Sequence, residues 1–467
     1  MAKALMVQGC TSGAGKSFLV TALCRAYARR GLRVAPFKAQ NMSNNARVVK
    51  GGEMGSAQYF QALAAGVEPE VRMNPVLIKP EADTKSQVVL LGRPDLELSR
   101  LPWAERKERL WPVVREALHS LLEDFDLLVL EGAGSPAEIN LKHADIVNMR
   151  VAKEAGARVL LVADIDRGGA FAHLYGTYAL LEPEEQALVA GFVLNKFRGD
   201  ASLLPPGPQQ LFELTGVRTL GVLPMWHTHG LPEEDGVLGP HPSQGAGFTV
   251  AVLAYPRLSN LDEFEPLKHL EGVRLVWARS ARELAGADLL VLPGSKHTRA
   301  DLEWLRAQGL EEAILAHHRS GRPILGICGG LQMMGAALRD PEGLEGGGSA
   351  RGLELFPYQT VWVREKVQRR TTLRLPRLEG YWSSLSGLEV EGYEIRHGRT
   401  GEGGLVYAQG NLLAVYFHGL FENEGVLEGL FGGRAPGLED TFERLADFLE
   451  AHLEPGVLER LISEGVS

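Results

Sequence analysis

Two series of short apolar runs, each alternating with longer helical patterns, are the feature of this sequence that most restricts its fold. Short apolar runs bounded by polar segments are typical of buried strands, and strands that alternate with helices form mostly parallel sheets covered on both faces. The sequence therefore predicts an α/β protein with two such sheets, the second of a size typical of a flavodoxin-like domain. The first series comprises residues 4–7, 33–37, 127–130, 159–163, 192–194 and 219–223, and the second 249–253, 274–277, 289–292, 323–327, 359–363 and 413–417.

A stretch without hydrophobic periodicity separates the two series. Residues 226–247 are rich in Gly, Pro, Glu, Asp and His, a composition typical of a linker. The chain then ends on a helical spacing of apolar residues, namely Phe442, Leu445, Phe448, Leu449 and Leu453. We therefore expect a first domain over 1–230, a linker over 231–247, a second domain over 248–440 and a helical tail over 441–467.

Composition restricts the class of protein further. The chain has 467 residues, of which 45% are hydrophobic, as expected for a globular protein with more than one domain. Its formal net charge of -9 argues against a general nucleic-acid binder, for which a basic domain is expected. The three widely spaced cysteines provide neither a disulfide framework nor paired zinc ligands, which is typical of a reducing cytoplasm. No apolar stretch approaches the roughly 20 residues of a membrane span. We expect a cytoplasmic protein that binds neither nucleic acid nor membrane, and nothing in the sequence indicates an oligomeric state.

A glycine-rich segment follows the first apolar run. Residues 9–17 read Gly-Cys-Thr-Ser-Gly-Ala-Gly-Lys-Ser and precede a helical pattern, so backbone N–H groups and the helix dipole would form an anion site there. Gly13 and Gly15 let the backbone curl around phosphate oxygens, Lys16 would contact the terminal phosphates and Ser17 would hold Mg²⁺. The loop is one residue longer than the usual phosphate-binding pattern, because Cys10 stands where Gly belongs. The segment predicts an ATP and Mg²⁺ site in a P-loop-like domain.

Acidic residues at the carboxyl ends of predicted strands are candidates for the metal site. Glu131 ends the run 127–130 and is followed by a glycine turn, and ligands in open parallel sheets bind at such strand ends. Asp164 and Asp166 end the next predicted strand in the same way. Glu53 lies in the glycine-rich segment Gly-Gly-Glu-Met-Gly, which we expect to be flexible enough to approach the nucleotide. The metal ligands predicted are Ser17, Glu131 and Glu53.

A cysteine in the second domain occupies a sharp turn. Cys328 follows the run 323–327 and precedes two glycines, a pattern that predicts a strand-to-helix elbow with an exposed nucleophile and nearby backbone N–H groups. A free thiol has a pKa of about 8.5, so it needs activation at neutral pH. Gly329 on the elbow, with Gly294 and Ser295 in a turn after another predicted strand, would stabilise an oxyanion and bind glutamine.

Three histidines are candidate bases for this thiol. His418 ends the last predicted strand, while His297 and His397 are alternatives on spacing alone. A nucleotide site activates an acceptor, and a thiol releases a group from a donor. The pairing therefore favours a synthetase that takes ammonia from glutamine and spends ATP to form an amide.

Longer strings of residues resemble known families. Residues 326–332 (GICGGLQ) resemble the nucleophile segment of class I glutamine amidotransferases, and the long phosphate loop resembles the dethiobiotin-synthetase-like ATP domain. The two fused in this order resemble the cobyrinate-amidating enzymes. The strings that favour the cobyric acid synthase family are FKAQNMSNN (37–45), EGAGSPAEINL (131–141), DIDRGG (164–169), LPGSK (292–296) and GYEI (392–395).

This resemblance covers nearly the whole chain and implies a substrate. It implies ATP- and glutamine-dependent amidation of the b, d, e and g carboxylates of adenosylcobyrinic acid a,c-diamide, a step in cobalamin biosynthesis. Three other functions remain open: a cobyrinic acid a,c-diamide synthase, a P-loop ATPase with a degenerate glutaminase-like domain, and a non-enzymatic corrinoid- or nucleotide-binding module.

The sequence departs from the family patterns at three positions. Typical class I glutaminases carry an acid two residues after the catalytic histidine, where this chain has Leu420, so the resemblance implies a Cys–His dyad. Glu422 is the nearest downstream carboxylate that could replace the acid. The family more often has Asn at His297, and His at the position of Arg396.

Overall fold

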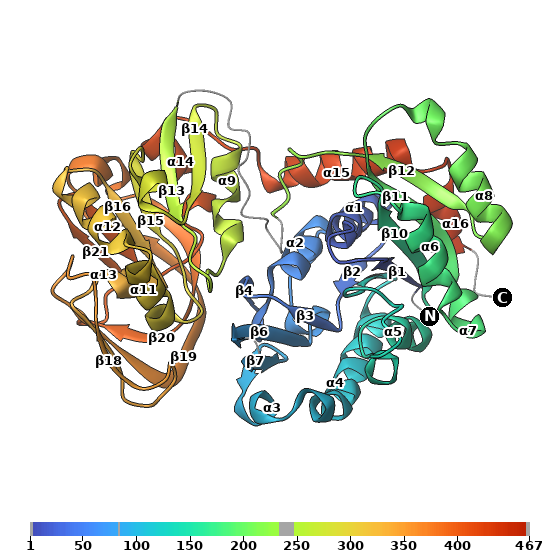
Figure 1. The fold of residues 1–467 in the computed structure, drawn as a ribbon, viewed down its shortest axis with the longest axis horizontal. Helices are drawn as coiled ribbons and strands as arrows, with labels where there is room; N and C mark the ends of the chain where they lie inside the picture. The colour runs from blue at the N-terminus through green and yellow to red at the C-terminus, as the bar shows by residue number, and fades with distance from the viewer. Residues whose placement is uncertain (1–2, 83–84, 233–246, 464–467) are drawn as a thin grey trace.

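The computed structural model describes residues 3–82, 85–232 and 247–463, which form two lobes (Figure 1). The first lobe contains the predicted nucleotide domain, and the second lobe contains the cysteine elbow. Most of the predicted linker, residues 233–246, lies outside the described residues. The division into 1–230, 231–247, 248–440 and 441–467 therefore stays a prediction.

The first lobe is built on a six-stranded parallel sheet of strand order β12-β11-β10-β1-β9-β2. All six predicted runs of the first series are strands, which confirms the α/β fold class. Their bounds are β1 Lys3–Gly9, β2 Val34–Phe37, β9 Leu127–Glu131, β10 Arg158–Asp164, β11 Val189–Phe197 and β12 Thr219–Pro224.

Helices cover both faces of this sheet because its residues point alternately to two cores. Met6 of β1 faces a core with α4, α5, α6 and α8, whereas Leu5 and Val7 face a core with α1, α15 and α16. The helices of this part of the chain are α1 Lys16–Arg29, α2 Ser56–Ala64, α3 Leu96–Arg100, α4 Trp103–Asp124, α5 Met149–Ala155, α6 Ala170–Ala179, α7 Pro183–Gln186 and α8 Pro206–Thr215.

An insertion after β2, which the sequence patterns did not predict, extends the first lobe toward the second. It holds a sheet of order β3-β6-β7-β8 and the hairpin β4-β5. Gly52 allows the hairpin to pack closely against Gly92, because a Cβ on Gly52 would lie 2.2 Å from the carbonyl oxygen of Gly92. The strands are β3 Gln40–Met42, β4 Ala46–Val49, β5 Gly52–Gly55, β6 Val76–Ala82, β7 Lys85–Leu90 and β8 Arg93–Asp95.

The second lobe contains a sheet of order β14-β13-β15-β16-β22-β21, parallel except for β21. Five predicted runs of the second series are strands of this sheet. Its strands are β13 Phe248–Leu253, β14 Val273–Ala278, β15 Leu289–Leu292, β16 Ile324–Ile327, β21 Val406–Gln409 and β22 Leu412–Val415. Its helices are α9 Glu265–Lys268, α10 Ala281–Leu284, α11 Thr298–Ala307, α12 Leu310–Arg319, α13 Gly329–Met334 and α14 Glu424–Phe431.

The sixth predicted run, 359–363, belongs to a different sheet. It is the start of β19, a long strand that pairs antiparallel with β20 in a sheet of order β18-β17-β19-β20. Most of β19 is exposed or half-buried and carries polar residues, so only its first part has the apolar run that predicts a strand. The strands are β17 Ala337–Asp340, β18 Gly348–Arg351, β19 Gln359–Arg374 and β20 Glu389–Thr400.

The C-terminal helices α15 (Leu438–His452) and α16 (Val457–Ser463) return to the first lobe, where Figure 1 shows them in red beside α1. Phe442 of α15 is fully buried in the core that also contains α1. Arginines on α1 face acids on α15, for example Arg25 and Glu443, whose charged atoms are 2.7 Å apart. Helices from the beginning and the end of the sequence thus share one hydrophobic core.

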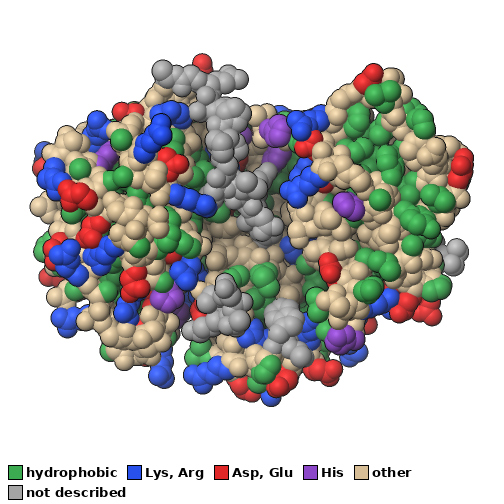
Figure 2. Space-filling model, viewed as in Figure 1, with side chains coloured by type: hydrophobic (Ala, Val, Ile, Leu, Met, Phe, Trp, Pro, Cys, Tyr) green, Lys and Arg blue, Asp and Glu red, His purple; other side chains and the backbone are tan. Residues whose placement is uncertain are grey.

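The surface carries charges of both signs over both lobes, as Figure 2 shows. Hydrophobic side chains gather on the right-hand lobe around α8, where Leu203, Phe212 and Leu214 are exposed. Across residues 3–82, 85–232 and 247–463, no helix is both long and apolar enough to cross a membrane.

We predict that Phe442→Ala lowers the free energy of unfolding by about 3–5 kcal/mol, because it removes a fully buried ring from the core that α15 shares with α1. The measurement is urea unfolding followed by circular dichroism. Leu438→Ala is the matched control, since Leu438 of the same helix is 38% exposed, and a change below about 1 kcal/mol is expected. Equal effects of the two substitutions would contradict the packing of α15 on the first lobe.

Candidate active sites

The glycine-rich segment forms a tight loop between β1 and the N-terminus of α1. Gly15 has φ 98°, and a Cβ there would lie 2.0 Å from the side-chain nitrogen of Asn195. Asn195 donates to the carbonyl oxygen of Ala14 at 2.9 Å, and Lys196 donates to that of Gly13 at 2.8 Å. The end of β11 therefore holds the loop in its curled form, with the first amides of the helix facing the same side.

Ser17 and Glu131 lie together beside this loop, because Val7 of β1 pairs with Glu131 of β9. The hydroxyl of Ser17 donates to Glu131 Oε1 at 2.9 Å, and Lys38 Nζ approaches the same oxygen at 2.9 Å. Burial opposes ionisation of Glu131, but Lys38 and neighbouring donors outweigh burial and lower its pKa. A hydroxyl next to an ionised carboxylate suits Mg²⁺, which binds few protein oxygens and takes the rest of its ligands from phosphate and water.

Lys16 lies inside the loop. Its side chain is buried, and Nζ is 3.4 Å from the carbonyl oxygens of both Thr11 and Gly134. The acids at and just after the end of β10 are paired with cations: Asp164 lies 3.3 Å from Lys196 Nζ, and Asp166 pairs with Arg198.

Glu53, predicted as a metal ligand, contacts two lysines, whereas Ser17 and Glu131 contact each other. It is fully buried, and its two carboxylate oxygens face Lys79, at 2.7 Å, and Lys366 of β19. Burial opposes its ionisation, but the two ammonium groups lower its pKa to about 2. The glycines around Glu53 suggested a flexible segment, whereas that segment is strand β5 and packs between the lobes.

Cys328 occupies a strained turn between β16 and α13. Its φ of 49° and ψ of -100° are unusual for a residue with a side chain. The turn needs a glycine directly after Gly329, because a Cβ on Gly330 would lie 1.8 Å from the carbonyl oxygen of Leu292. The backbone nitrogen of Cys328 donates to Val415 at 2.8 Å, so the elbow is fixed to β22, the strand that leads to His418.

The turn after β15 packs against both the elbow and the candidate base. A Cβ on Gly329 would lie 2.7 Å from the backbone nitrogen of Ser295, so these two backbones are in contact. A Cβ on Gly294 would lie 2.8 Å from His418 Cε1. The structure thus brings the predicted oxyanion residues Gly294, Ser295 and Gly329 together with Cys328 and His418.

A carboxylate that the sequence analysis missed orients His418. Glu263 Oε1 lies 2.9 Å from His418 Nδ1, and its Oε2 accepts from the backbone nitrogen of Gly419 at 3.1 Å. Both side chains are buried, and the ring of Tyr393 stacks on the imidazole with centroids 5.4 Å apart. Burial lowers the pKa of His418, but Glu263 and Cys328 outweigh it and raise the pKa to about 10.

The resemblance implied a Cys–His dyad whose imidazole is oriented by other contacts, and the structure supplies that contact as an acid from another part of the chain. Glu263 belongs to the 3₁₀ helix η4 (Leu261–Phe264), far before Cys328 in sequence. Leu420 is buried among apolar side chains, and Glu422 pairs with Arg47 rather than with His418. The adjacent acids of η4 followed by Phe264 were the available signal, since two acids next to a core aromatic need a buried partner.

The other two candidate histidines have different partners. His297 accepts from the backbone nitrogen of Ala300, at 3.3 Å, as the cap of α11 and lies 3.4 Å from Glu345. His397 Nδ1 lies 3.1 Å from the carbonyl oxygen of Val363. Burial, with Lys366 and Lys296 nearby, lowers the pKa of His397 to about 4.

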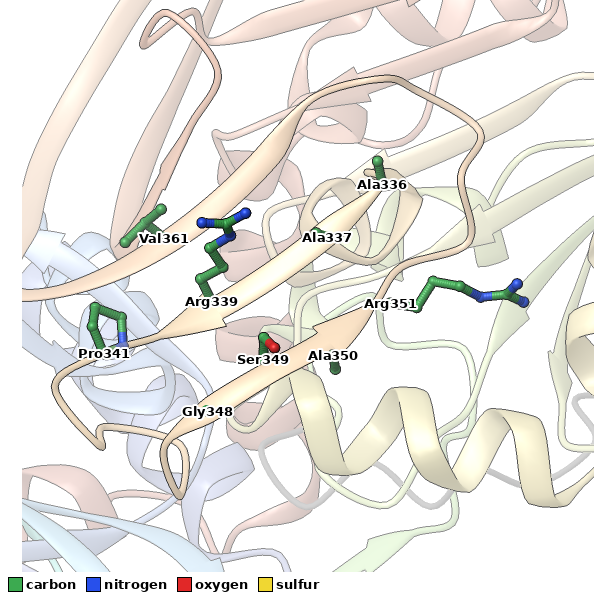
Figure 3. A pocket seen from close by; sticks show the side chains of 9 residues that line it. All are labelled: Ala336, Ala337, Arg339, Pro341, Gly348, Ser349, Ala350, Arg351 and Val361. Atoms are coloured by element: carbon green, nitrogen blue, oxygen red, sulfur yellow. The ribbon is translucent and has the colours of Figure 1, made fainter.

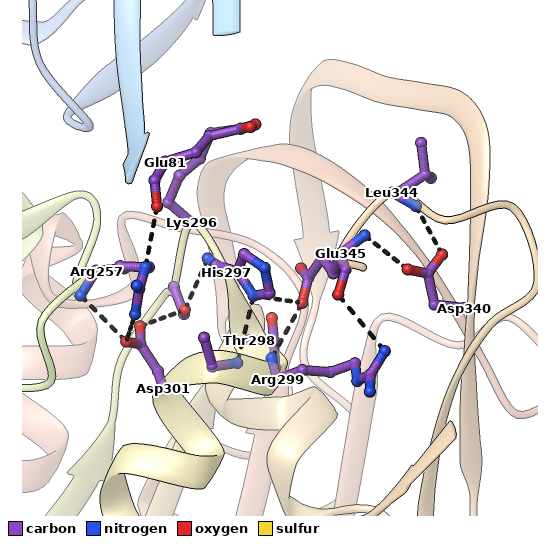
Figure 4. Close-up of polar contacts among 12 residues, drawn as sticks. Glu81, Arg257, Lys296, His297, Thr298, Arg299, Asp301, Asp340, Leu344 and Glu345 are labelled. Atoms are coloured by element: carbon purple, nitrogen blue, oxygen red, sulfur yellow. Dashed lines mark hydrogen bonds and ion pairs between the residues drawn. The ribbon is translucent and has the colours of Figure 1, made fainter. Parts of the chain in front are cut away.

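A polar network supports the oxyanion turn (Figure 4). Ser295 Oγ donates to Asp301 at 2.6 Å, and the backbone nitrogen of Arg257 donates to the same carboxylate at 3.2 Å. Burial raises the pKa of Asp301 to about 6, although these donors oppose the rise. Lys296 reaches across to Glu81 of the first lobe, 3.4 Å away. The turn is thus tied to α11 and to the facing lobe.

A hollow of about 650 Å³ opens beside the β17–β18 hairpin. Figure 3 shows Arg339 and Arg351 among small residues around it. None of the predicted site residues lines this hollow, so it is separate from the thiol site.

The fold and these sites define a phosphate-loop nucleotide domain joined to a cysteine-dependent glutamine amidotransferase domain. The model of the CobQ/CobB/MinD/ParA nucleotide binding domain matches residues 5–230, and that of the CobB/CobQ-like glutamine amidotransferase domain matches residues 249–426.

Full-length relatives identify the family more narrowly. Proteins named cobyric acid synthase from Polaromonas sp. JS666, Variovorax paradoxus S110 and Polaromonas naphthalenivorans CJ2 are 56%, 60% and 60% identical to this chain. Each alignment covers 99% of this chain and at least 99% of the relative. The chain belongs to the cobyric acid synthase family, the glutamine amidotransferase ligases of cobalamin biosynthesis, as its motifs predicted.

We predict that Glu263→Gln reduces the glutaminase kcat by about a hundredfold or more, because the imidazole loses the carboxylate that orients it. The pKa of His418 should also fall from about 10, since a group that raises it is removed while burial still lowers it. The alkaline limb of the kcat–pH profile, where His418 loses its proton, should therefore move to lower pH. Glu424→Gln, a change at an exposed acid, is the control. An unchanged profile in Glu263→Gln would reject the role of Glu263.

Proposed function

We propose that this chain is a glutamine-hydrolysing cobyric acid synthase. It amidates the b, d, e and g carboxylates of adenosylcobyrinic acid a,c-diamide, using ammonia from glutamine and the energy of ATP, to give adenosylcobyric acid. One observation carries the proposal: this chain of the family holds two sites. One site has a thiol beside an oriented histidine, and the other has a phosphate loop beside an ionised carboxylate. Neither site alone makes an amide from a carboxylate.

In the glutaminase half-reaction, Cys328 attacks the amide carbon of glutamine. The protonated imidazole of His418 favours the thiolate and gives its proton to the departing ammonia, so the C–N bond breaks and a thioester forms. Backbone N–H groups of the elbow and of the Gly294–Ser295 turn stabilise the oxyanion. Water then attacks the thioester, with His418 as the base, and releases glutamate.

In the synthetase half-reaction, a substrate carboxylate attacks the terminal phosphorus of ATP, and the bond to the β-phosphate oxygen breaks to release ADP. The acyl phosphate that forms is attacked by ammonia, which gives the amide and releases phosphate. Lys16 and the amides of the loop neutralise charge on the transferring phosphoryl group. Ser17 and Glu131 would hold Mg²⁺, which would neutralise further phosphate charge. Lys38 keeps Glu131 ionised and so suited to that role.

Product analysis tests the substrate assignment. The a,c-diamide and the corresponding acid without amides are incubated separately with ATP and glutamine, and products are separated by ion exchange and identified by mass. We expect the a,c-diamide to pass through species that each lose one negative charge and to end with four new amides. Two amidations of the acid without amides, and none of the a,c-diamide, would identify a cobyrinic acid a,c-diamide synthase instead. ATP turnover without any corrinoid product would reject both synthetases.

We predict that Cys328→Ala abolishes glutamine-dependent synthesis but keeps synthesis from high ammonia, because the thiol acts only in nitrogen release. The measurement is amide formation with each nitrogen source. Cys24→Ala, at a thiol buried in α1, should keep both activities. Loss of both activities in a folded Cys328→Ala protein would contradict separate sites.

We predict that Lys16→Ala removes synthesis with either nitrogen source, because both routes use the same phosphoryl transfer. Amide formation and ATP consumption are measured together, with Lys153→Ala as a control at a lysine that is 42% exposed. Ammonia-dependent synthesis near the wild-type rate in Lys16→Ala would reject the phosphate-loop assignment.

A further inference from the structure

Arg47 of the first lobe is buried among residues of the second. It lies on β4, in the insertion after β2, and only 2% of its surface is exposed. Its Nε donates to Asp262 at 2.7 Å, and its Nη1 donates to Glu422 at 2.8 Å. A guanidinium group can hold two carboxylates at once because its N–H groups point in fixed directions within one plane.

The two acids flank the side chains of the glutaminase site. Asp262 directly precedes Glu263 on η4, and Glu422 lies on the 3₁₀ helix η6 (Leu420–Glu422), which begins two residues after His418. Arg47 therefore bridges the segment that carries the acid and the segment that carries the base. The distance between Glu263 and His418 depends on how these two segments lie relative to each other.

Backbone contacts fix the same junction. Asn45 accepts from the backbone nitrogen of Leu261 at 2.9 Å, and Asn260 accepts from that of Ala46 at 3.1 Å. Asn260 has φ 56°, a conformation that starts η4 and aims its acids inward. The reciprocal pair leaves little freedom for η4 to shift along β4.

Aromatic contacts extend the bridge to the imidazole. The guanidinium carbon of Arg47 lies 5.0 Å from the ring centroid of Tyr393, which in turn stacks on His418. Tyr393 and His418 also form a β-bridge through their backbones. Arg47 thus touches both acidic segments and the ring that packs on the base, without contacting the thiol.

We propose that Arg47 is a positioning residue for glutamine hydrolysis: the first lobe, through β4, holds Glu263 and His418 in the geometry that activates Cys328. This inference rests on the proposed function and adds that the glutaminase depends on docking of the synthetase domain. The segment from Lys38, which pairs with Glu131, to Arg47 is short, so the two sites are joined by one stretch of chain.

The test compares Arg47→Met with wild type under two nitrogen sources. We expect glutamine-dependent synthesis and glutaminase kcat to fall about 10–100-fold, since small displacements of catalytic groups have effects of this size. Ammonia-dependent synthesis should stay within about twofold, because the phosphate loop is untouched, and KM for glutamine should change little. Arg370→Met is the matched control: Arg370 also crosses to β4, 3.4 Å from the carbonyl oxygen of Val48, but is bonded to neither acidic segment. It should keep both activities.

A second variant keeps the proposal testable if Arg47→Met does not fold. Arg47→Lys retains the charge but cannot span both acids with the same geometry, so we expect intermediate glutamine-dependent synthesis and full ammonia-dependent synthesis. Equal losses with both nitrogen sources in a folded variant, or unchanged glutamine-dependent synthesis in both variants, would overturn the inference. Wild-type protein that forms no amide from ammonia would instead reject the proposed function.

Discussion

Charges buried in pairs between the two lobes are the constraint on which the rest of the structure depends. Arg47 is buried against Asp262, and Glu53 is buried between Lys79 and Lys366. A buried charge left without its partner costs several kcal/mol, so these groups favour one docking register over any that separates them. Burial lowers the pKa of Lys79 to about 7, although Glu53 beside it opposes the shift. The interface therefore fixes the geometry of the site next to it.

The parallel sheets determine where each site lies within its lobe. Loops at the carboxyl ends of adjacent parallel strands meet at one edge, so β1 and β9 bring the phosphate loop to Glu131. In the second lobe, Gly326 of β16 pairs with Ala414 of β22, and the same rule brings Cys328 to His418. Strand order alone thus brings Ser17 to Glu131, more than a hundred positions apart, and Cys328 to His418, nearly as far apart.

This rule also explains what the sequence could predict. The strands, the phosphate loop, the cysteine elbow and His418 each depend on local patterns or on strand order, and these could be inferred from apolar runs and glycines. The adjacent acids before Phe264 indicated that Glu263 has a buried partner, but not that the partner is His418, because that contact depends on η4 packing against η6, far along the chain. Glu53 was misjudged for a related reason: its flanking glycines indicated flexibility, whereas they allow close packing against Gly92. The packing of α15 against α1 could not be predicted either, since the apolar spacing of an amphipathic helix indicates that one face is buried but not which element covers it.

The two sides of the thiol site are both supported from the first lobe. On the side of the base, Arg47 holds the segments of Glu263 and His418; on the side of the oxyanion turn, Glu81 contacts Lys296 by its carboxylate and Arg257 by its carbonyl oxygen, 3.0 Å from Nε. Ammonia released at Cys328 would thus form beside the interface rather than on an outer surface. Lys79 and Lys296 are buried at this interface beside Glu53 and Glu81, and burial lowers the pKa of both lysines. Under the proposed function, the interface that orients the base is therefore also the place where the nitrogen for the synthetase site is released.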